Sequence, residues 1–136
     1  MILIRYLCFV VLLTACSSAT DKSSQHCPVS SNRDWQMSLI ELSPERYHLT
    51  VIGKVDLPTP GYSIHWQSEI THRRIPPELQ LDLTAIKRSN KVVIQQVTTQ
   101  TTRFEQAGAH AAYSAIHVFC HGRHLHTFSQ ARAQPQ

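Results

Sequence analysis

Four histidines lie close together near the end of the chain, in the stretch "HVFCHGRHLH" at 117–126. If Gly122 and Arg123 form a two-residue turn with glycine first, as in a type II′ hairpin, then His121 faces His124. His126 lies further along the same face. Facing side chains in a hairpin are about 5 Å apart. In this register His121, His124 and His126 could converge on one zinc or copper ion.

The alternative is an exposed polar face that happens to use histidine. No carboxylate or thiolate is placed beside these three side chains to complete a metal site. A register shifted by one residue would also move the rings to opposite faces of the sheet. The cofactor prediction is therefore none, with zinc or copper at His121, His124 and His126 as the alternative.

The N-terminal residues have the pattern of a secretory signal. Arg5 precedes an apolar run from Tyr6 to Leu13, and small residues follow it as far as Cys16. The run is too short to span a bilayer as a helix, which needs about 20 residues. No other long apolar run follows. We therefore expect residues 1–15 to be a signal peptide and expect no transmembrane helix.

The last four residues of this region, Leu13-Thr14-Ala15-Cys16, resemble the lipobox of bacterial lipoproteins. In that family the cysteine thiol receives a diacylglycerol, the signal is cut before it, and the new amino group takes an acyl chain such as palmitate. The resemblance implies that Cys16 is the lipid-bearing first residue, and two or more acyl chains give a stable anchor. Aspartate after the cysteine retains family members at the inner membrane. Ser17 here implies the outer membrane, where the source has two.

Cys27 and Cys120 are the two cysteines that remain outside the signal and its lipidation site. An exported chain meets an oxidising compartment, where paired cysteines form disulfides. A histidine lies next to each cysteine in the sequence, which leaves a reactive thiol as the alternative. Sequence adjacency does not place imidazole and thiol in catalytic geometry, so we predict a Cys27–Cys120 disulfide.

The stretch "LPTPGYSIHW" at 57–66 resembles one loop of chagasin-like inhibitors of cysteine proteases, which have an immunoglobulin-like fold. Their loop has the form Asn-Pro-Thr-Thr-Gly-aromatic. The candidate binding loop here consists of Pro58, Thr59, Pro60, Gly61 and Tyr62. It departs from the family at Leu57 and Pro60, and the family's two other loops have no counterpart. The resemblance implies a loop that enters a papain-like active site. The alternative is a stiff turn in which Gly61 supplies a positive φ.

No motif of an enzyme or of a nucleotide-binding site is present. The sequence lacks Gly-x-Ser-x-Gly, a phosphate loop and a dinucleotide fingerprint. Its nine acidic residues form no close pair. From Thr71 onward there are eight Lys or Arg and three Asp or Glu. This basic half suits an anionic surface such as lipid headgroups or cell-wall polymer, or else a solvated sheet face. We expect neither an enzyme nor a nucleic-acid partner.

The elements that must position these residues are strands, because apolar residues recur at every second position. Tyr47, Leu49, Val51, Val55 and Leu57 show the pattern, and Pro- and Gly-rich turns separate the runs. We expect about seven strands, near 35–42, 46–57, 62–70, 78–86, 91–104, 112–121 and 124–129. The stretch "AGAHAAYSAIH" also allows a helical turn. The expected fold is an all-β, immunoglobulin-like antiparallel β-sandwich, with a small β-barrel as the alternative.

Together these patterns divide the chain into a signal peptide (1–15), a lipidated flexible tether (16–25), a β-sandwich domain (26–129) and a disordered tail (130–136). The expected function is that of a lipid-anchored envelope protein. It would act as a binding or structural module in the periplasm or at the cell surface, with an envelope partner of unknown identity. The alternatives are a chagasin-like cysteine protease inhibitor and a histidine-rich metal-binding lipoprotein.

Overall fold

The computed structural model describes residues 26–88 and 94–135, and within these ranges the regular structure is entirely β-strand. Among the described residues, no helix is long and apolar enough to cross a membrane. The strands are β1 (Ser31–Ser43), β2 (Arg46–Leu57), β3 (Tyr62–His72), β4 (Glu78–Lys87), β5 (Thr98–Ala109), β6 (Ala112–Cys120), β7 (Arg123–Arg132) and β8 (Gln134–Pro135).

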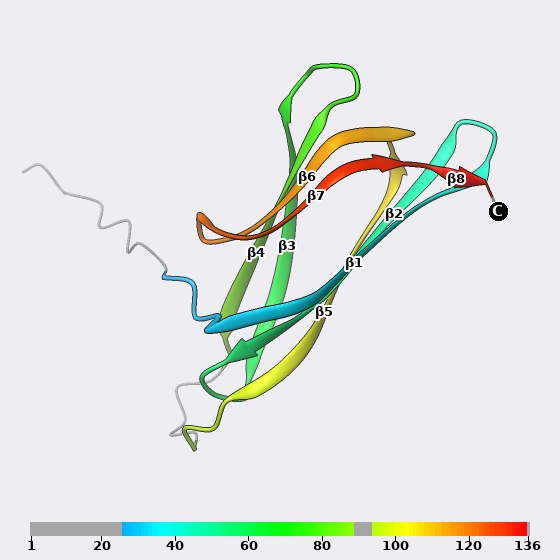
Figure 1. Ribbon diagram of the computed structural model, residues 1–136. Coiled ribbons are helices and arrows are strands. Elements are labelled where there is room, and N and C mark those ends of the chain that lie inside the picture. Colours follow the sequence, from blue (N-terminus) through cyan, green and yellow to red (C-terminus); the bar gives the residue numbers. More distant parts are fainter. Residues whose placement is uncertain (1–25, 89–93, 136) are drawn as a thin grey trace, which may run out of the picture.

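The strands form two four-stranded sheets, which pack as a sandwich (Figure 1). One sheet has the order β5-β2-β1-β8 and the other the order β3-β4-β6-β7. The predicted β-sandwich is confirmed, and the sheets do not close into the alternative barrel. The pairing is not wholly antiparallel, however, because β4 pairs with β6 and β1 pairs with β8 in parallel. Each sheet is therefore mixed.

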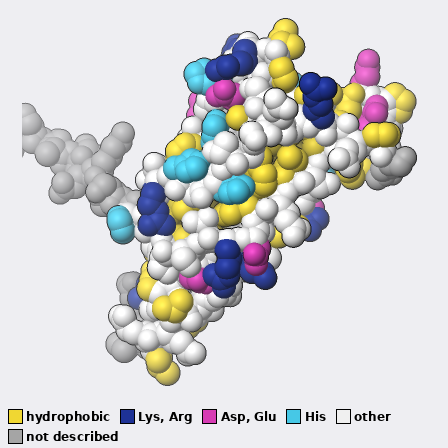
Figure 2. All heavy atoms as spheres, viewed as in Figure 1, with side chains coloured by type: hydrophobic (Ala, Val, Ile, Leu, Met, Phe, Trp, Pro, Cys, Tyr) yellow, Lys and Arg dark blue, Asp and Glu magenta, His cyan; other side chains and the backbone are white. Residues whose placement is uncertain are grey.

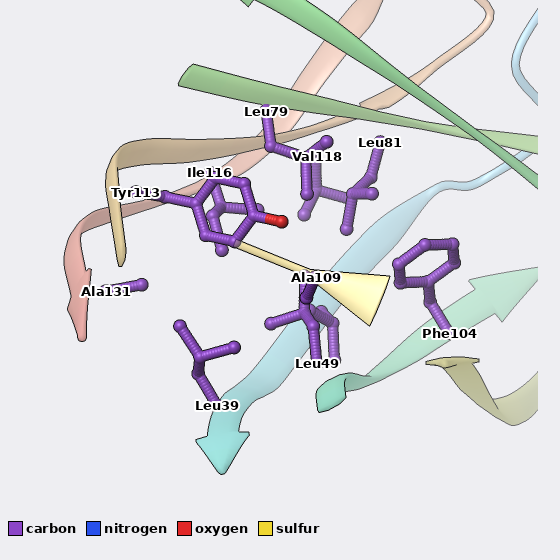
Figure 3. Close-up of a cluster of buried hydrophobic side chains, with 11 residues drawn as sticks. Leu39, Leu49, Leu79, Leu81, Phe104, Ala109, Tyr113, Ile116, Val118 and Ala131 are labelled. Carbon is purple, nitrogen blue, oxygen red and sulfur yellow. The ribbon is translucent and has the colours of Figure 1, made fainter. Parts of the chain in front are cut away.

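The core lies between the two sheets and follows directly from the period-two pattern. In β4, Leu79, Leu81 and Leu83 are buried while the residues between them are half-buried on the outer face. Leu49 and Val51 of β2, in the opposite sheet, form one cluster with Leu79 and Leu81. Figure 3 shows how side chains from both sheets fill this cluster, with Tyr113 at one end. The Tyr113 hydroxyl accepts a hydrogen bond from the backbone N–H of His110 at 3.0 Å.

The boundaries of β5 differ most from the expectation. The strand was expected over 91–104 and lies at Thr98–Ala109. Residues 91–93 lie outside the described residues, and 94–97 have no regular structure. Apolar β-branched residues suggested a strand at 94–97, yet Ile94 and Val97 are exposed. The helical turn that the stretch "AGAHAAYSAIH" allows does not form, since β5 reaches Ala109 and β6 begins at Ala112.

The C-terminal segment expected to be a disordered tail is part of the sandwich as far as residue 135. Strand β7 continues to Arg132, and Ala131 is buried in the core. The backbone N–H of Ala133 donates to Ala111 O at 2.8 Å. Short β8 then pairs with β1 at Ile40 and Glu41. Polar residues flank Ala131 in the sequence, so the sequence pattern did not indicate its burial.

The sandwich has two ends with different roles (Figure 1). At the entry end the chain arrives at residues 26–30, and the 58–61 loop, the start of β5 and the β6–β7 turn also lie there. At the distal end lie the β1–β2 turn, the β3–β4 loop at 73–77 and the β5–β6 turn at 110–111. Strand registers fix this assignment, since Ser31 pairs with Asp56 and His72 with Glu78.

Candidate binding surfaces

The predicted disulfide is confirmed at the entry end. Cys27 and Cys120 are bonded, with their Cα atoms 5.5 Å apart. Both are buried and pack with Val29, Val55 and Leu83 in the smaller of two core clusters. The bond ties the residues that lead into β1 to the end of β6, 93 positions later in the chain. A buried, bonded pair excludes the alternative of a reactive thiol at these two positions.

The β6–β7 hairpin has a different register from the one that the metal site requires. Its turn is formed by His121 and Gly122, both with positive φ (47° and 82°). Positive φ at both central residues is the pattern of a type I′ turn. A bulge follows, because Phe119 pairs with His124 and Val118 with His126. Leu125 is the extra residue, and it packs against both core clusters.

The bulge separates the three histidines that the sequence grouped together. His121 lies in the turn, where its Nε2 atom is buried without a hydrogen-bond partner among the described residues. His124 shares the outer face of the sheet with Phe119, whereas His126 shares the inner face with Val118. No group of three or more His, Cys, Asp or Glu in the described chain is arranged to hold a metal. The described residues therefore do not form the alternative zinc or copper site at His121, His124 and His126.

His126 instead belongs to an aromatic cluster where β1 and β7, which belong to different sheets, contact each other. Its ring stacks on Trp35 at a centroid distance of 6.1 Å and meets Phe128 edge-on at 4.6 Å. Trp35 also meets Trp66 edge-on. Burial among these rings, and then the nearby charge of His124, lower the pKa of His126 below its ordinary value. The side chain therefore serves packing as a neutral ring.

The outer face of β6 and β7 carries a polar chain that the sequence analysis missed. Thr127 Oγ1 lies 3.0 Å from His117 Nδ1 and 2.7 Å from His124 Nε2. The other nitrogen of His117, Nε2, lies 3.8 Å from Glu78 Oε2. Glu78 reaches this face from the neighbouring strand β4 through the parallel β4–β6 pair. A parallel pair between distant segments has no local sequence signal, so this contact could not be predicted.

The candidate binding loop at 58–62 joins β2 to β3 at the entry end. The side chain of Thr59 is buried, and its Oγ1 has no hydrogen-bond partner in the described structure. Pro60 and Gly61 are exposed, and Gly61 has the positive φ (92°) expected for a turn. The protease-inhibitor function that the resemblance implies stays a prediction. Cys16, the predicted lipidation site, lies outside the described residues.

A different surface, at the distal end, has the properties of a docking site. We call it the distal tip and define it as the 73–77 loop together with residues 110–112. Ile75 at its summit is 100% exposed. Beside it is a mostly apolar cleft of about 400 Å³ lined by Ile70, Arg73, Arg74, Ile75, Pro77 and His110. Large apolar side chains left in water commonly mark interaction sites when they adjoin a concave surface.

Ion pairs and hydrogen bonds hold the distal tip in place. Arg74 Nη2 lies 3.0 Å from Glu78 Oε1, and His72 Nε2 lies 3.5 Å from Glu78 Oε2. The carbonyl of Pro77 accepts from both the backbone N–H and the hydroxyl of Ser114. Figure 2 shows apolar, cationic, acidic and histidine side chains gathered over this loop at the top of the molecule. The apolar cleft is thus presented on an anchored loop with arginines at its rim.

Comparison of the chain with family models, with curated proteins and with solved structures gives no match.

Proposed function

We propose that the chain is a lipid-anchored binding module of the cell envelope, held by acylated Cys16 and presenting its distal tip to a partner protein. The observation that carries the binding role is Ile75, fully exposed beside an apolar cleft. Burying one such side chain in an interface contributes about 1.5–3 kcal/mol. Interfaces concentrate their binding energy in a few anchors of this kind.

The position of the tip fits this role. It lies at the end of the sandwich opposite to the residues that lead in from Cys16 (Figure 1). A module held at one end presents the other end to proteins in the surrounding compartment. Arg74 is paired with Glu78, and Arg73, which also lines the cleft, favours a partner that places an acidic side chain beside an apolar one. The outer membrane is the expected location where the source has two membranes.

Capture from detergent-solubilised membranes with the intact lipoprotein tests the binding role. We expect wild-type protein to retain a specific partner and Ile75→Asp to lose it. Ile94→Asp is a matched control, since it makes the same change at an exposed isoleucine of the entry end. Equal capture by wild type and Ile75→Asp would show that the tip is not the docking surface.

The anchoring role has its own test. Metabolic labelling with a palmitate analogue should mark the wild-type chain and leave Cys16→Ser unlabelled, because that cysteine supplies the acceptor thiol. The variant should also leave the membrane fraction. A Cys16→Ser chain that still fractionates with membranes would contradict lipid anchoring through this residue.

A further inference from the structure

Exposed large apolar side chains gather at the entry end of the sandwich as well as at the distal tip. Ile86, Ile94 and Val97 are 46%, 80% and 64% exposed, and all three lie at the junction of β4 and β5. The other exposed large apolar residues in the described chain, Leu42 and Ile75, lie at the distal end. Since residues at the two ends cannot share a surface, the entry end needs its own explanation.

Basic side chains accompany these apolar residues. Lys87 and Arg88 follow Ile86 directly and are exposed. The backbone N–H of Arg88 donates to Gly61 O at 3.0 Å, which fixes this segment against the 58–61 loop. We call Ile86, Lys87, Arg88, Ile94 and Val97 the basal patch. Its combination of exposed aliphatic and cationic groups matches the interfacial region of an anionic bilayer, where both kinds of side chain are stabilised.

The carboxylate of Asp56, at the same end, does not weaken the attraction of the basal patch to anionic lipid. Asp56, the last residue but one of β2, lies beside the start of β5, and Arg33 Nη1 lies 2.6 Å from its Oδ2 atom. The hydroxyls of Ser31 and Thr99 also donate to it, at 2.5 and 2.6 Å. Its charge is therefore compensated within the protein, and the basic side chains of the basal patch set the sign of the field there.

The chain itself indicates which surface the basal patch meets. Cys16 precedes Cys27 by eleven positions, and an extended chain of that length reaches at most about 40 Å. Cys27 is fixed at the entry end by its bond to Cys120. A lipid on Cys16 therefore holds Cys27 within about 40 Å of the bilayer and brings the entry end closer to the bilayer, on average, than the distal tip. Tethering also raises the effective concentration of the domain at the lipid surface, so a docked state is populated even where docking is weak.

We propose that the basal patch docks onto the anionic lipid surface of the membrane that holds Cys16. Ile94 and Val97 enter the headgroup region, and Lys87 and Arg88 contact lipid phosphates. The distal tip then points away from the bilayer. This proposal rests on the proposed function, because the acylated cysteine is what selects the bilayer as the occupant of the patch.

Vesicle co-sedimentation of the unlipidated chain tests the docking without the anchor. A chain from Ser17 to Gln136 contains every described strand and the disulfide. We expect it to bind vesicles of phosphatidylglycerol and phosphatidylethanolamine, and to bind phosphatidylcholine vesicles far less. Each basic residue near an anionic surface strengthens binding about five-fold. Lys87→Glu should therefore weaken binding at least about five-fold, and added salt should weaken it further.

The decisive comparison uses two substitutions with the same change in charge. Ile94→Asp should weaken vesicle binding about ten-fold, since it removes an inserted aliphatic group and adds a repelled charge. Ile75→Asp adds its charge at the other end of the sandwich, where salt screens it from the lipid surface. It should therefore leave vesicle binding within about two-fold of the wild type. Both side chains are exposed, and intact folding of each variant is checked by circular dichroism.

Failure of wild-type binding to anionic vesicles, or equal loss in Ile94→Asp and Ile75→Asp, would overturn the docking proposal. Because this assay needs no acyl chain, its outcome is separate from the labelling of Cys16. A chain that is labelled but does not bind anionic vesicles would be anchored without docking. If the chain from Ser17 to Gln136 binds vesicles but the full chain carries no label at Cys16, the result would contradict the proposed anchoring instead.

Discussion

Removal of the Cys27–Cys120 bond should cost a large part of the stability of this domain. The clean perturbation is the double substitution Cys27→Ala with Cys120→Ala, because serine would leave hydroxyl groups buried at both positions. The bond closes a loop of 93 positions. In the chain-entropy model, a cross-link of that length disfavours the unfolded state by about 4.5 kcal/mol.

A second contribution comes from packing. Both sulfur atoms lie in a cluster with Val29, Val55 and Leu83, so alanine leaves a small cavity there. Cavities of this size cost about 1 kcal/mol each. The total expected loss is about 5.5 kcal/mol, against a net stability of about 5–15 kcal/mol for ordinary domains. The double variant should therefore be close to the limit of folding.

Urea unfolding, followed by tryptophan fluorescence, measures the effect. Trp35 and Trp66 are both half-buried and report on the packing between the sheets. The unfolding midpoint should fall strongly, and the slope should rise because the open unfolded chain exposes more surface. Reduction of the wild type should reproduce most of the loss, apart from the cavity term. A loss below about 1 kcal/mol in both experiments would refute the loop-closure reasoning.

Three further predictions concern the packing of the two sheets. Gly53→Ala should destabilise the fold by about 1–3 kcal/mol in urea unfolding, because an added Cβ would overlap the ring of Trp35; unchanged stability would contradict this packing. Trp66→Phe should cost about 1–3 kcal/mol, since Trp66 Nε1 donates at 2.9 Å to the buried hydroxyl of Thr102; an equal loss in a Thr102→Val background, when Trp66→Phe is compared in that background and in the wild type, would rule the bond out. The pKa of His126 is lowered in the folded state, so the unfolded chain binds a proton first and stability should fall as pH drops below about 6.5. His126→Phe should lose less stability than wild type between about pH 7.5 and pH 5.5, and an equal loss would assign the pH dependence to other groups.

The sandwich could be predicted because its strands carry a strong local signal. Leu79, Leu81 and Leu83 alternate with polar residues, and the structure buries all three. Pro-rich and Gly-rich segments marked the breaks between strands, and β2 occupies the predicted residues. The disulfide was predictable for a similar reason, since few cysteines remained to pair. The strand predictions need only neighbouring residues in the sequence, and the disulfide prediction needs only the number of cysteines left to pair.

The arrangement of His121, His124 and His126 differs from the one considered in the sequence analysis because it depends on a single residue of register. A His-Gly turn with positive φ at both positions replaced the expected Gly-Arg turn. Glycine at the second central position is a type I′ signal, and it was available in the sequence. The bulge at Leu125 had no such signal. At the bulge, the Leu125 side chain packs against the core, between exposed His124 and half-buried His126.

The distal tip and the polar chain on the outer face could not be predicted, because both depend on contacts between residues far apart in the sequence. Glu78 reaches His117 only because β4 and β6 pair in parallel, and Ile75 reads in the sequence as an ordinary apolar residue before prolines. Its complete exposure depends on a loop held by Arg74 and Ser114. Period and composition do not encode such a loop.

We propose above all that this β-sandwich is held at a membrane by lipid on Cys16. Mass spectrometry of the N-terminal peptide of the mature protein, isolated from membranes, tests it most directly. We predict a peptide that begins at Cys16 and carries a diacylglycerol on its thiol and an acyl chain on its amino group. A mature chain that begins elsewhere, or an unmodified Cys16 in the membrane-bound protein, would contradict the account.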